Sequence, residues 1–106
     1  MVLQPAKKFP PSSWHVYILR CRDGALYTGY TNDLDTRLSA HNAGGGAKYT
    51  ASRLPVKVVY AESADSKSAA MKREFQIKRW TKAKKEALIT GNCHKLRRLS
   101  KRKPGV

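Results

Sequence analysis

The first thirty residues of the chain hold two apolar, β-branched segments separated by a turn signal. Residues 14–21 (WHVYILRC) are apolar on both faces in their middle, a pattern typical of a central strand that is covered on both sides. Asp23 and Gly24 predict a tight turn, and residues 25–30 form a second short run with strand propensity. The pattern therefore predicts an antiparallel hairpin.

After the hairpin the apolar spacing changes to that of a helix. Thr31 and Asn32 are residue types that cap helices, and Asp33 falls in the first turn, where the helix dipole favours negative charge. Leu34 begins an apolar stripe that returns four residues later. We expect a short amphipathic helix over residues 33–42.

The middle of the chain predicts a loop and then a third strand. The three consecutive glycines within residues 42–46 indicate a flexible loop, because glycine adopts backbone conformations that other residues avoid. Residues 56–62 have strand propensity and follow Pro55, which suits the beginning of a strand. Ser66 then caps a helix that runs to about residue 80.

A further short helix is expected over residues 82–89, with Thr81 as its cap and Gly91 closing it. The order strand, strand, helix, strand, helix, helix predicts an α+β domain with a small three-stranded mixed or antiparallel sheet between helices, in α/β/α layers. We assign residues 14–90 to this domain. Residues 1–13, which contain three prolines, are expected to form a flexible arm, and residues 91–106 a basic tail that begins as a short helix.

Charge is the strongest feature of the composition. The 106 residues include 22 Lys and Arg against 7 Asp and Glu, a formal net charge of +15. Because such a surplus repels itself in a compact fold, it indicates an anionic partner, and nucleic acid is the leading candidate. Ribosomal proteins have a similar composition, so the charge indicates the partner and not an activity.

The remaining composition predicts an intracellular, cytoplasmic protein with reduced cysteines. No apolar run approaches the roughly 20 residues that span a bilayer, and no secretory signal follows Met1. Cys21 and Cys93 alone make neither a disulfide framework nor a four-ligand zinc site, even with the three histidines. We interpret both as reduced structural residues.

Two tripeptides and three single residues, in order, resemble the GIY-YIG nuclease superfamily. The resemblance covers residues 14–90 and is closest to small stand-alone bacterial members and to the nuclease domain of eukaryotic structure-specific endonucleases, through residues 41–50. It is carried by Val16-Tyr17-Ile18, Tyr27-Thr28-Gly29, Arg37, His41 and Glu74. It implies a metal-dependent endonuclease that hydrolyses DNA, as in DNA repair, with one divalent ion.

The resemblance also implies roles for these side chains. Tyr17, Tyr27, Arg37 and His41 would be catalytic, and Glu74 would bind Mg²⁺ or Mn²⁺. The chemistry agrees, since a guanidinium matches a phosphate and a phenol can take a proton once a nearby cation assists it. Tyr27 is favoured as the general base, although the sequence also leaves this role open to the other tyrosine and to the histidine.

The chain departs from the family pattern at three positions. Val16 replaces a glycine, and Thr28 replaces the common isoleucine; both suit a strand. Tyr30 stands where some members carry a lysine, so one cation that could lower the pKa of a phenol is missing. Each site residue also has a structural interpretation: the tyrosines can simply pack, and Glu74 can pair with Lys78.

Two functions of different classes follow. The first is an endonuclease acting on single-stranded or branched DNA with little sequence specificity, as a monomer or weak dimer, and without a membrane. The second is a non-catalytic module that binds structured RNA or DNA. Basic residues expected to contact the nucleic-acid backbone in either case are Lys48, Arg53, Lys57, Lys78 and Arg79.

Overall fold

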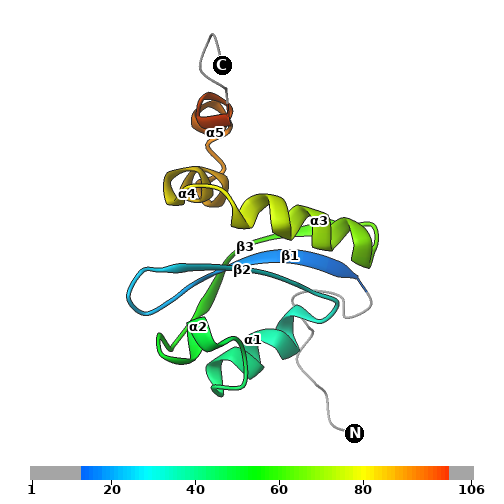
Figure 1. The fold of residues 1–106 in the computed structure, drawn as a ribbon, viewed down its shortest axis with the longest axis vertical. Coiled ribbons are helices and arrows are strands. Elements are labelled where there is room, and N and C mark those ends of the chain that lie inside the picture. Colours follow the sequence, from blue (N-terminus) through cyan, green and yellow to red (C-terminus); the bar gives the residue numbers. More distant parts are fainter. Residues whose placement is uncertain (1–12, 101–106) are drawn as a thin grey trace, which may run out of the picture.

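The computed structural model describes residues 13–100. All but one residue of the predicted N-terminal arm and the last six residues of the predicted tail lie outside this range. The described chain forms three strands and five helices (Figure 1). In order they are β1 (Trp14–Arg20), β2 (Leu26–Thr31), α1 (Leu34–Asn42), α2 (Lys48–Ala51), β3 (Lys57–Ala64), α3 (Lys67–Lys78), α4 (Lys82–Thr90) and α5 (Cys93–Ser100).

The strands form one antiparallel sheet in the order β2-β1-β3. The central strand β1 is the apolar segment, buried on both faces from His15 to Leu19, because helices cover the sheet on two sides. In the hairpin, Tyr17 stands opposite Gly29, and Leu19 stands opposite Tyr27. The predicted hairpin, central strand and layered α+β class are confirmed, with a sheet that is antiparallel throughout.

Strand alternation divides the core into two clusters, one on each face. On the face covered by α1, the buried Tyr17, Leu19 and Leu34 pack together, with Tyr27 partly buried beside them. On the face covered by α3 and α4, a second cluster contains Val16, Ile18, Ala70 and Ile77, with Trp14 and Trp80 packed against it. Consecutive residues of β1 therefore point to different clusters, as a pleated strand requires.

Two ion pairs connect the α3–α4 layer to the sheet. Arg20 at the end of β1 makes a bidentate contact with Glu86 of α4, at 2.8 and 2.6 Å. Arg73 of α3 contacts Glu62 of β3 at 2.8 Å, and Glu62 also accepts a hydrogen bond from Tyr60. Burial and this carboxylate raise the pKa of the Tyr60 phenol to about 12.

The ends of the helices agree with the predicted caps except at α1. Ser66 and Thr81 accept hydrogen bonds from the backbone of α3 and α4, and Gly91 ends α4 in the left-handed conformation with φ of 72°. At α1 the prediction of Thr31 or Asn32 as cap is wrong, because Asp33 itself accepts from the Thr36 N–H. Thr31 instead accepts a hydrogen bond from the Asp33 N–H.

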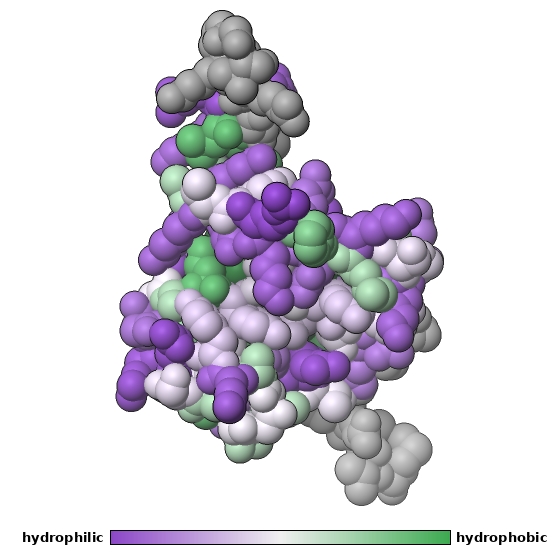
Figure 2. All heavy atoms as spheres, viewed as in Figure 1, coloured by the Kyte–Doolittle hydropathy of each residue, from purple (hydrophilic) through white to green (hydrophobic). Residues whose placement is uncertain are grey.

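A short helix that the sequence pattern did not predict follows the loop predicted over residues 42–46. α2 spans only four residues and has no side-chain cap, so neither periodicity nor a capping residue marks it. The predicted start of the tail is helical, as α5, and Figure 2 shows hydrophilic side chains over much of the α3–α4 layer. Among residues 13–100, no helix combines the length and apolarity needed to cross a bilayer.

Candidate active site

A chain of buried hydrogen bonds joins β1, α1 and α2. The Tyr17 hydroxyl lies 3.2 Å from His41 Nε2, and His41 Nδ1 lies 2.8 Å from Thr50 Oγ1. All three residues are at most 1% exposed. A residue of the central strand is thus connected to the segment after the glycine-rich loop through one imidazole.

The hydrogen bonds determine which histidine nitrogen carries the proton. The Thr50 hydroxyl donates its only hydrogen to the Ala47 carbonyl at 2.9 Å, so its oxygen accepts from His41 Nδ1–H. His41 Nε2 is then the unprotonated nitrogen and accepts the phenolic hydrogen of Tyr17. Burial, and next the charge of Arg37, lower the pKa of His41, which favours this neutral form.

Two glycines make room for this pair of side chains. A Cβ at Gly29 would collide with the ring and hydroxyl of Tyr17, the residue opposite it in the hairpin. A Cβ at Gly46 would collide with the imidazole of His41. Gly46 is therefore part of the site, while the sequence indicated only a flexible loop there. Thr50 was also missed as a partner of His41, although it lies in the segment that carries the family resemblance.

The tyrosines open onto a polar cleft of about 320 Å³ at the β2 edge of the sheet. Arg37 of α1 and Glu74 of α3 line the same cleft, although their helices cover opposite faces of the sheet. The cleft is lined by Trp14, Tyr17, Tyr27, Gly29, Tyr30, Thr31, Asn32, Arg37, Lys67 and Glu74. His41 lies behind the two tyrosines, its ring centroid 5.3 Å from that of Tyr27.

The phenol of Tyr17 is a poor acid in this environment. Burial is the main cause that raises its pKa well above the usual range, with a further contribution from Tyr27, while Arg37 acts in the opposite direction. A buried phenolate has lost its hydration, and the positive charge of one guanidinium compensates for only part of that loss. Tyr17 therefore holds its proton and directs it to His41.

One lysine lines the cleft together with Tyr30, which replaces the family's lysine, and a second lies beside Tyr27. Lys67 lines the cleft, with its ammonium 6.0 Å from the Trp14 ring centroid. Lys78 lies 5.8 Å from the Tyr27 ring centroid and pairs with Glu74 at 3.4 Å. Although β2 lacks the family's lysine, two lysines of α3 therefore lie beside the cleft and Tyr27.

The donor set fits one divalent ion that keeps most of its water. Glu74 has a side chain 16% exposed and borders the cleft. Mg²⁺ commonly takes one or two carboxylates together with water and substrate phosphate oxygens. Within the described residues there is no group of three or more His, Cys, Asp or Glu side chains that could enclose a metal, and Glu74 is the one carboxylate among the residues that line the cleft.

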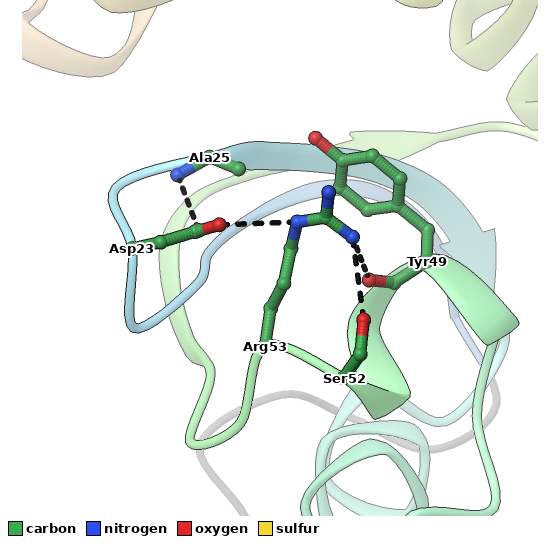
Figure 3. A network of polar contacts seen from close by, with 5 residues as sticks. All are labelled: Asp23, Ala25, Tyr49, Ser52 and Arg53. Carbon is green, nitrogen blue, oxygen red and sulfur yellow. Dashed lines mark hydrogen bonds and ion pairs between the residues drawn. The ribbon is translucent and has the colours of Figure 1, made fainter.

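The basic residues expected to contact nucleic acid lie in different places. Lys48 is exposed at the start of α2, and Arg79 is exposed at the end of α3 with its guanidinium 5.4 Å from the Phe75 ring centroid. Lys57 lies on the other edge strand, β3, away from the cleft. Arg53 lies over the Tyr49 ring and contacts Asp23, as Figure 3 shows.

An antiparallel sheet covered by helices on both faces, together with this cleft, defines a class of protein. The chain belongs to the GIY-YIG family, since its residues 13–87 match the family model described as the GIY-YIG catalytic domain. This confirms the family expected from the motifs around Tyr17 and Tyr27. GIY-YIG domains belong to nucleases, so a nuclease-type domain acting on nucleic acid is the coarse functional class.

Within this class the chain is similar to proteins designated UPF0213. One from Halobacterium salinarum is 57% identical over 75 residues, which cover 71% of this chain and 97% of the relative. Another, from Staphylococcus saprophyticus, is 51% identical over 76 residues, covering 72% and 93%. A solution NMR structure of an E. faecalis protein is 41% identical and superimposes with a TM-score of 0.51, covering 76% of this chain and 86% of that one.

Proposed function

We propose that this protein is a metal-dependent endonuclease that hydrolyses phosphodiester bonds of single-stranded or branched DNA with little sequence specificity. The observation that carries the proposal is the convergence of Tyr17, Tyr27, Arg37 and Glu74, from four elements, on one cleft. A cleft lined by a guanidinium, phenols and a carboxylate can hold a phosphate and supply the acid and base groups that hydrolysis needs.

In this proposal Arg37 binds the scissile phosphate. Its guanidinium is exposed on α1 and faces the cleft, so two parallel hydrogen bonds to phosphate oxygens are available to it. The negative charge that develops on the phosphate oxygens strengthens these bonds in the transition state. A divalent ion held by Glu74 would polarise the phosphate and stabilise the departing 3′-oxygen.

The hydrogen bonds favour the Tyr17–His41 pair as the group that activates water. Because His41 Nε2 already accepts the Tyr17 proton, the phenol oxygen can take a proton from water while it gives its own to the imidazole. No free phenolate forms in this transfer, so the raised pKa of Tyr17 does not prevent it. Tyr27, which the sequence favoured for this role, would then orient the water from the cleft wall.

The net charge of +15 supports binding to the DNA backbone without reading of bases. We further propose that the protein is a monomer or weak dimer located in the cytoplasm. We assign catalysis to residues 14–90 and backbone contacts to Lys48, Arg53, Lys57, Lys78 and Arg79, with the basic tail from residue 91 as a further contact.

A second candidate is a nucleic-acid-binding module without cleavage. The ion pair between Lys78 and Glu74 favours it, because the ammonium occupies the carboxylate that a metal ion would need. Metal binding must displace this lysine. The pair is held at 3.4 Å between consecutive turns of α3, with the lysine side chain 54% exposed. Such an exposed pair is weak, and the displacement costs little.

Cleavage assays separate the two functions. Purified protein is incubated with nicked, flapped and single-stranded DNA and with Mg²⁺ or Mn²⁺. We expect cleavage by the wild type, loss of cleavage in Glu74→Ala, and a decrease of about 10²-fold or more in Arg37→Ala. The matched controls are Asp65→Ala and Arg22→Ala, an exposed aspartate and an exposed arginine that do not line the cleft. DNA binding without cleavage by wild-type protein would establish the binding module instead.

A further inference from the structure

A second hollow lies next to the cleft, on the other side of Tyr27. This side pocket measures about 240 Å³ and is lined by Leu26, Tyr27 and Thr28 of β2, Tyr49 of α2, Lys78 of α3 and Lys85 of α4. Tyr27 borders both the side pocket and the cleft. The Tyr27 side chain therefore separates an occupant of the side pocket from the proposed phosphate site.

Tyr49 forms an exposed aromatic wall of this pocket, and it is held in place without a ligand. The residue is 42% exposed, which is unusual for a large aromatic residue beside a core. Its ring stacks near Tyr27, with centroids 6.2 Å apart, and the Arg53 guanidinium lies 4.2 Å from its centroid. Arg53 donates to the Tyr49 carbonyl at 2.9 Å and to Asp23 at 3.1 Å, so this cation is itself fixed (Figure 3).

Two ammonium groups line the pocket together. Lys78 and Lys85 are close enough that the charge of Lys78, after burial, contributes to lowering the pKa of Lys85. Among residues 13–100, no carboxylate forms an ion pair with Lys85. An anionic group placed between the two lysines would relieve their repulsion, and a phosphate is the natural candidate in a chain of this charge.

The pocket also has one polar group that no described residue satisfies. Thr28 is 2% exposed, and its hydroxyl has no hydrogen-bond partner within residues 13–100. Because this hydroxyl is itself buried, an occupant of the pocket contacts it only after the Thr28 side chain turns toward the pocket.

We propose that the side pocket binds an unpaired nucleobase of the nucleotide next to the scissile phosphate, with Lys78 and Lys85 contacting the adjoining backbone phosphate. This inference rests on the proposed function, because it places the DNA strand across Tyr27. Aromatic side chains beside a cationic groove form the arrangement on which unpaired bases stack. A base in a duplex must first leave its stack to enter the pocket, so the pocket selects single-stranded DNA on one side of the cut.

The test compares two oligonucleotides of equal charge. Binding is measured with a chelator present, by fluorescence anisotropy, for a thymidine hexanucleotide and for the same backbone with all bases removed. One stacked base is worth a few kcal/mol at most, so we expect the wild type to prefer the thymidine strand on the order of tenfold. Tyr49→Ala should bind both strands with nearly equal affinity, and Lys85→Ala should weaken both by the same factor.

Phe75→Ala is the matched control, since Phe75 is another exposed aromatic residue beside an arginine, on the outer side of α3. It should retain the wild-type preference for bases. Tyr49→Leu, which keeps an apolar side chain against Tyr27, should also lose the preference if Tyr49→Ala proves unstable. Equal binding of both strands by wild-type protein, or an unchanged preference in both Tyr49 variants, would overturn the inference.

The outcomes distinguish this inference from the proposed function. Cleavage of single-stranded DNA together with no preference for bases would overturn the side pocket alone. A preference for bases that depends on Tyr49, in a protein that never cleaves, would support the pocket and overturn the nuclease. Absence of binding to either strand would overturn both.

Discussion

At the scale of single residues, the site depends on glycines, which leave room for the side chains of Tyr17 and His41. Gly29 lies opposite Tyr17, where any Cβ would overlap the phenol. The neighbouring strand backbone cannot move away without disturbing the ladder of β1 and β2. The position of the phenol is therefore set by its glycine partner in the hairpin.

Gly29→Ala should lower the free energy of unfolding by about 1–3 kcal/mol and reduce cleavage, because the Tyr17 ring must shift. Urea denaturation and a cleavage assay measure the two effects. The matched control is Gly45→Ala, where an added Cβ meets nothing closer than the Ala40 carbonyl oxygen at 3.6 Å. Equal stability of the two variants would contradict this role of Gly29.

The two tyrosines are distinguished by their hydrogen bonding. If Tyr17 and His41 together accept the proton from water, Tyr17→Phe removes the path and should decrease turnover by about 10²-fold or more. Tyr27→Phe would retain the Tyr17–His41 pair and should lose less turnover. Single-turnover cleavage at saturating DNA measures both variants. A larger loss in Tyr27→Phe would return the role of base to Tyr27, as the sequence favoured.

Protonation of His41 should destabilise the fold. Burial lowers its pKa below the ordinary value of 6.5, so the unfolded chain takes up a proton at a higher pH than the folded chain does. The unfolded state then binds more protons, and the free energy of unfolding falls as the pH decreases through 6.5 toward the lower folded pKa. Urea denaturation at pH 7.5 and 5.5 should reveal this loss in the wild type and a smaller one in His41→Gln. An identical loss in both proteins would assign the effect to other groups.

Sequence reasoning predicted the residues whose positions follow from regular structure. Strand alternation places Tyr17 and Tyr27 on one face, and helical spacing places Arg37 and His41 on one stripe. Gly46 and Thr50 could not be placed in this way, because the irregular turn after α1 brings the short helix α2 back against α1. No period relates residues on either side of such a turn, as His41 and Thr50 are, nine positions apart.

At the scale of elements, the direction of β3 was what the sequence left open. The prediction identified residues 14–21 as a central strand, which is confirmed, but left the sheet mixed or antiparallel. Because β1 is central, β2 and β3 lie at opposite edges, and Lys57 on β3 is separated from the cleft on β2.

The cap of α1 offers a test at this scale, since this helix carries Arg37 and His41. Asp33 accepts hydrogen bonds from the Thr36 N–H at 3.2 Å and the Thr36 hydroxyl at 2.8 Å. Asp33→Ala should lower the free energy of unfolding by about 1 kcal/mol, measured by urea denaturation. Asp33→Asn preserves an acceptor for the Thr36 N–H and should lose less of the free energy of unfolding. Equal effects of the two substitutions would indicate that the cap does not hold this helix.

At the scale of the whole molecule, the net charge of +15 should make DNA affinity depend steeply on salt. Each phosphate neutralised releases counterions, so the logarithm of the binding constant falls linearly with the logarithm of salt concentration. Replacing Lys95 and Arg98 of α5 by glutamate should weaken binding and flatten this slope, while turnover at saturating DNA stays unchanged. Anisotropy titrations at several salt concentrations measure the slope, and a fall in saturated turnover would show that α5 also serves catalysis.

The contact between His41 and Thr50 joins α1 to the segment that follows the glycine-rich loop, and Asn42 next to it exchanges two hydrogen bonds with the backbone of Val56. Neighbouring side chains of one helix thus hold the following connection at Thr50, in its middle, and at Val56, just before β3. Replacing His41 removes one of these contacts and the proton acceptor of Tyr17 together, so two causes contribute to its kinetic defect. Thr50→Val keeps the imidazole and removes its contact with residue 50, together with the Thr50–Ala47 hydrogen bond, so its own kinetic defect measures how much of catalysis depends on this support.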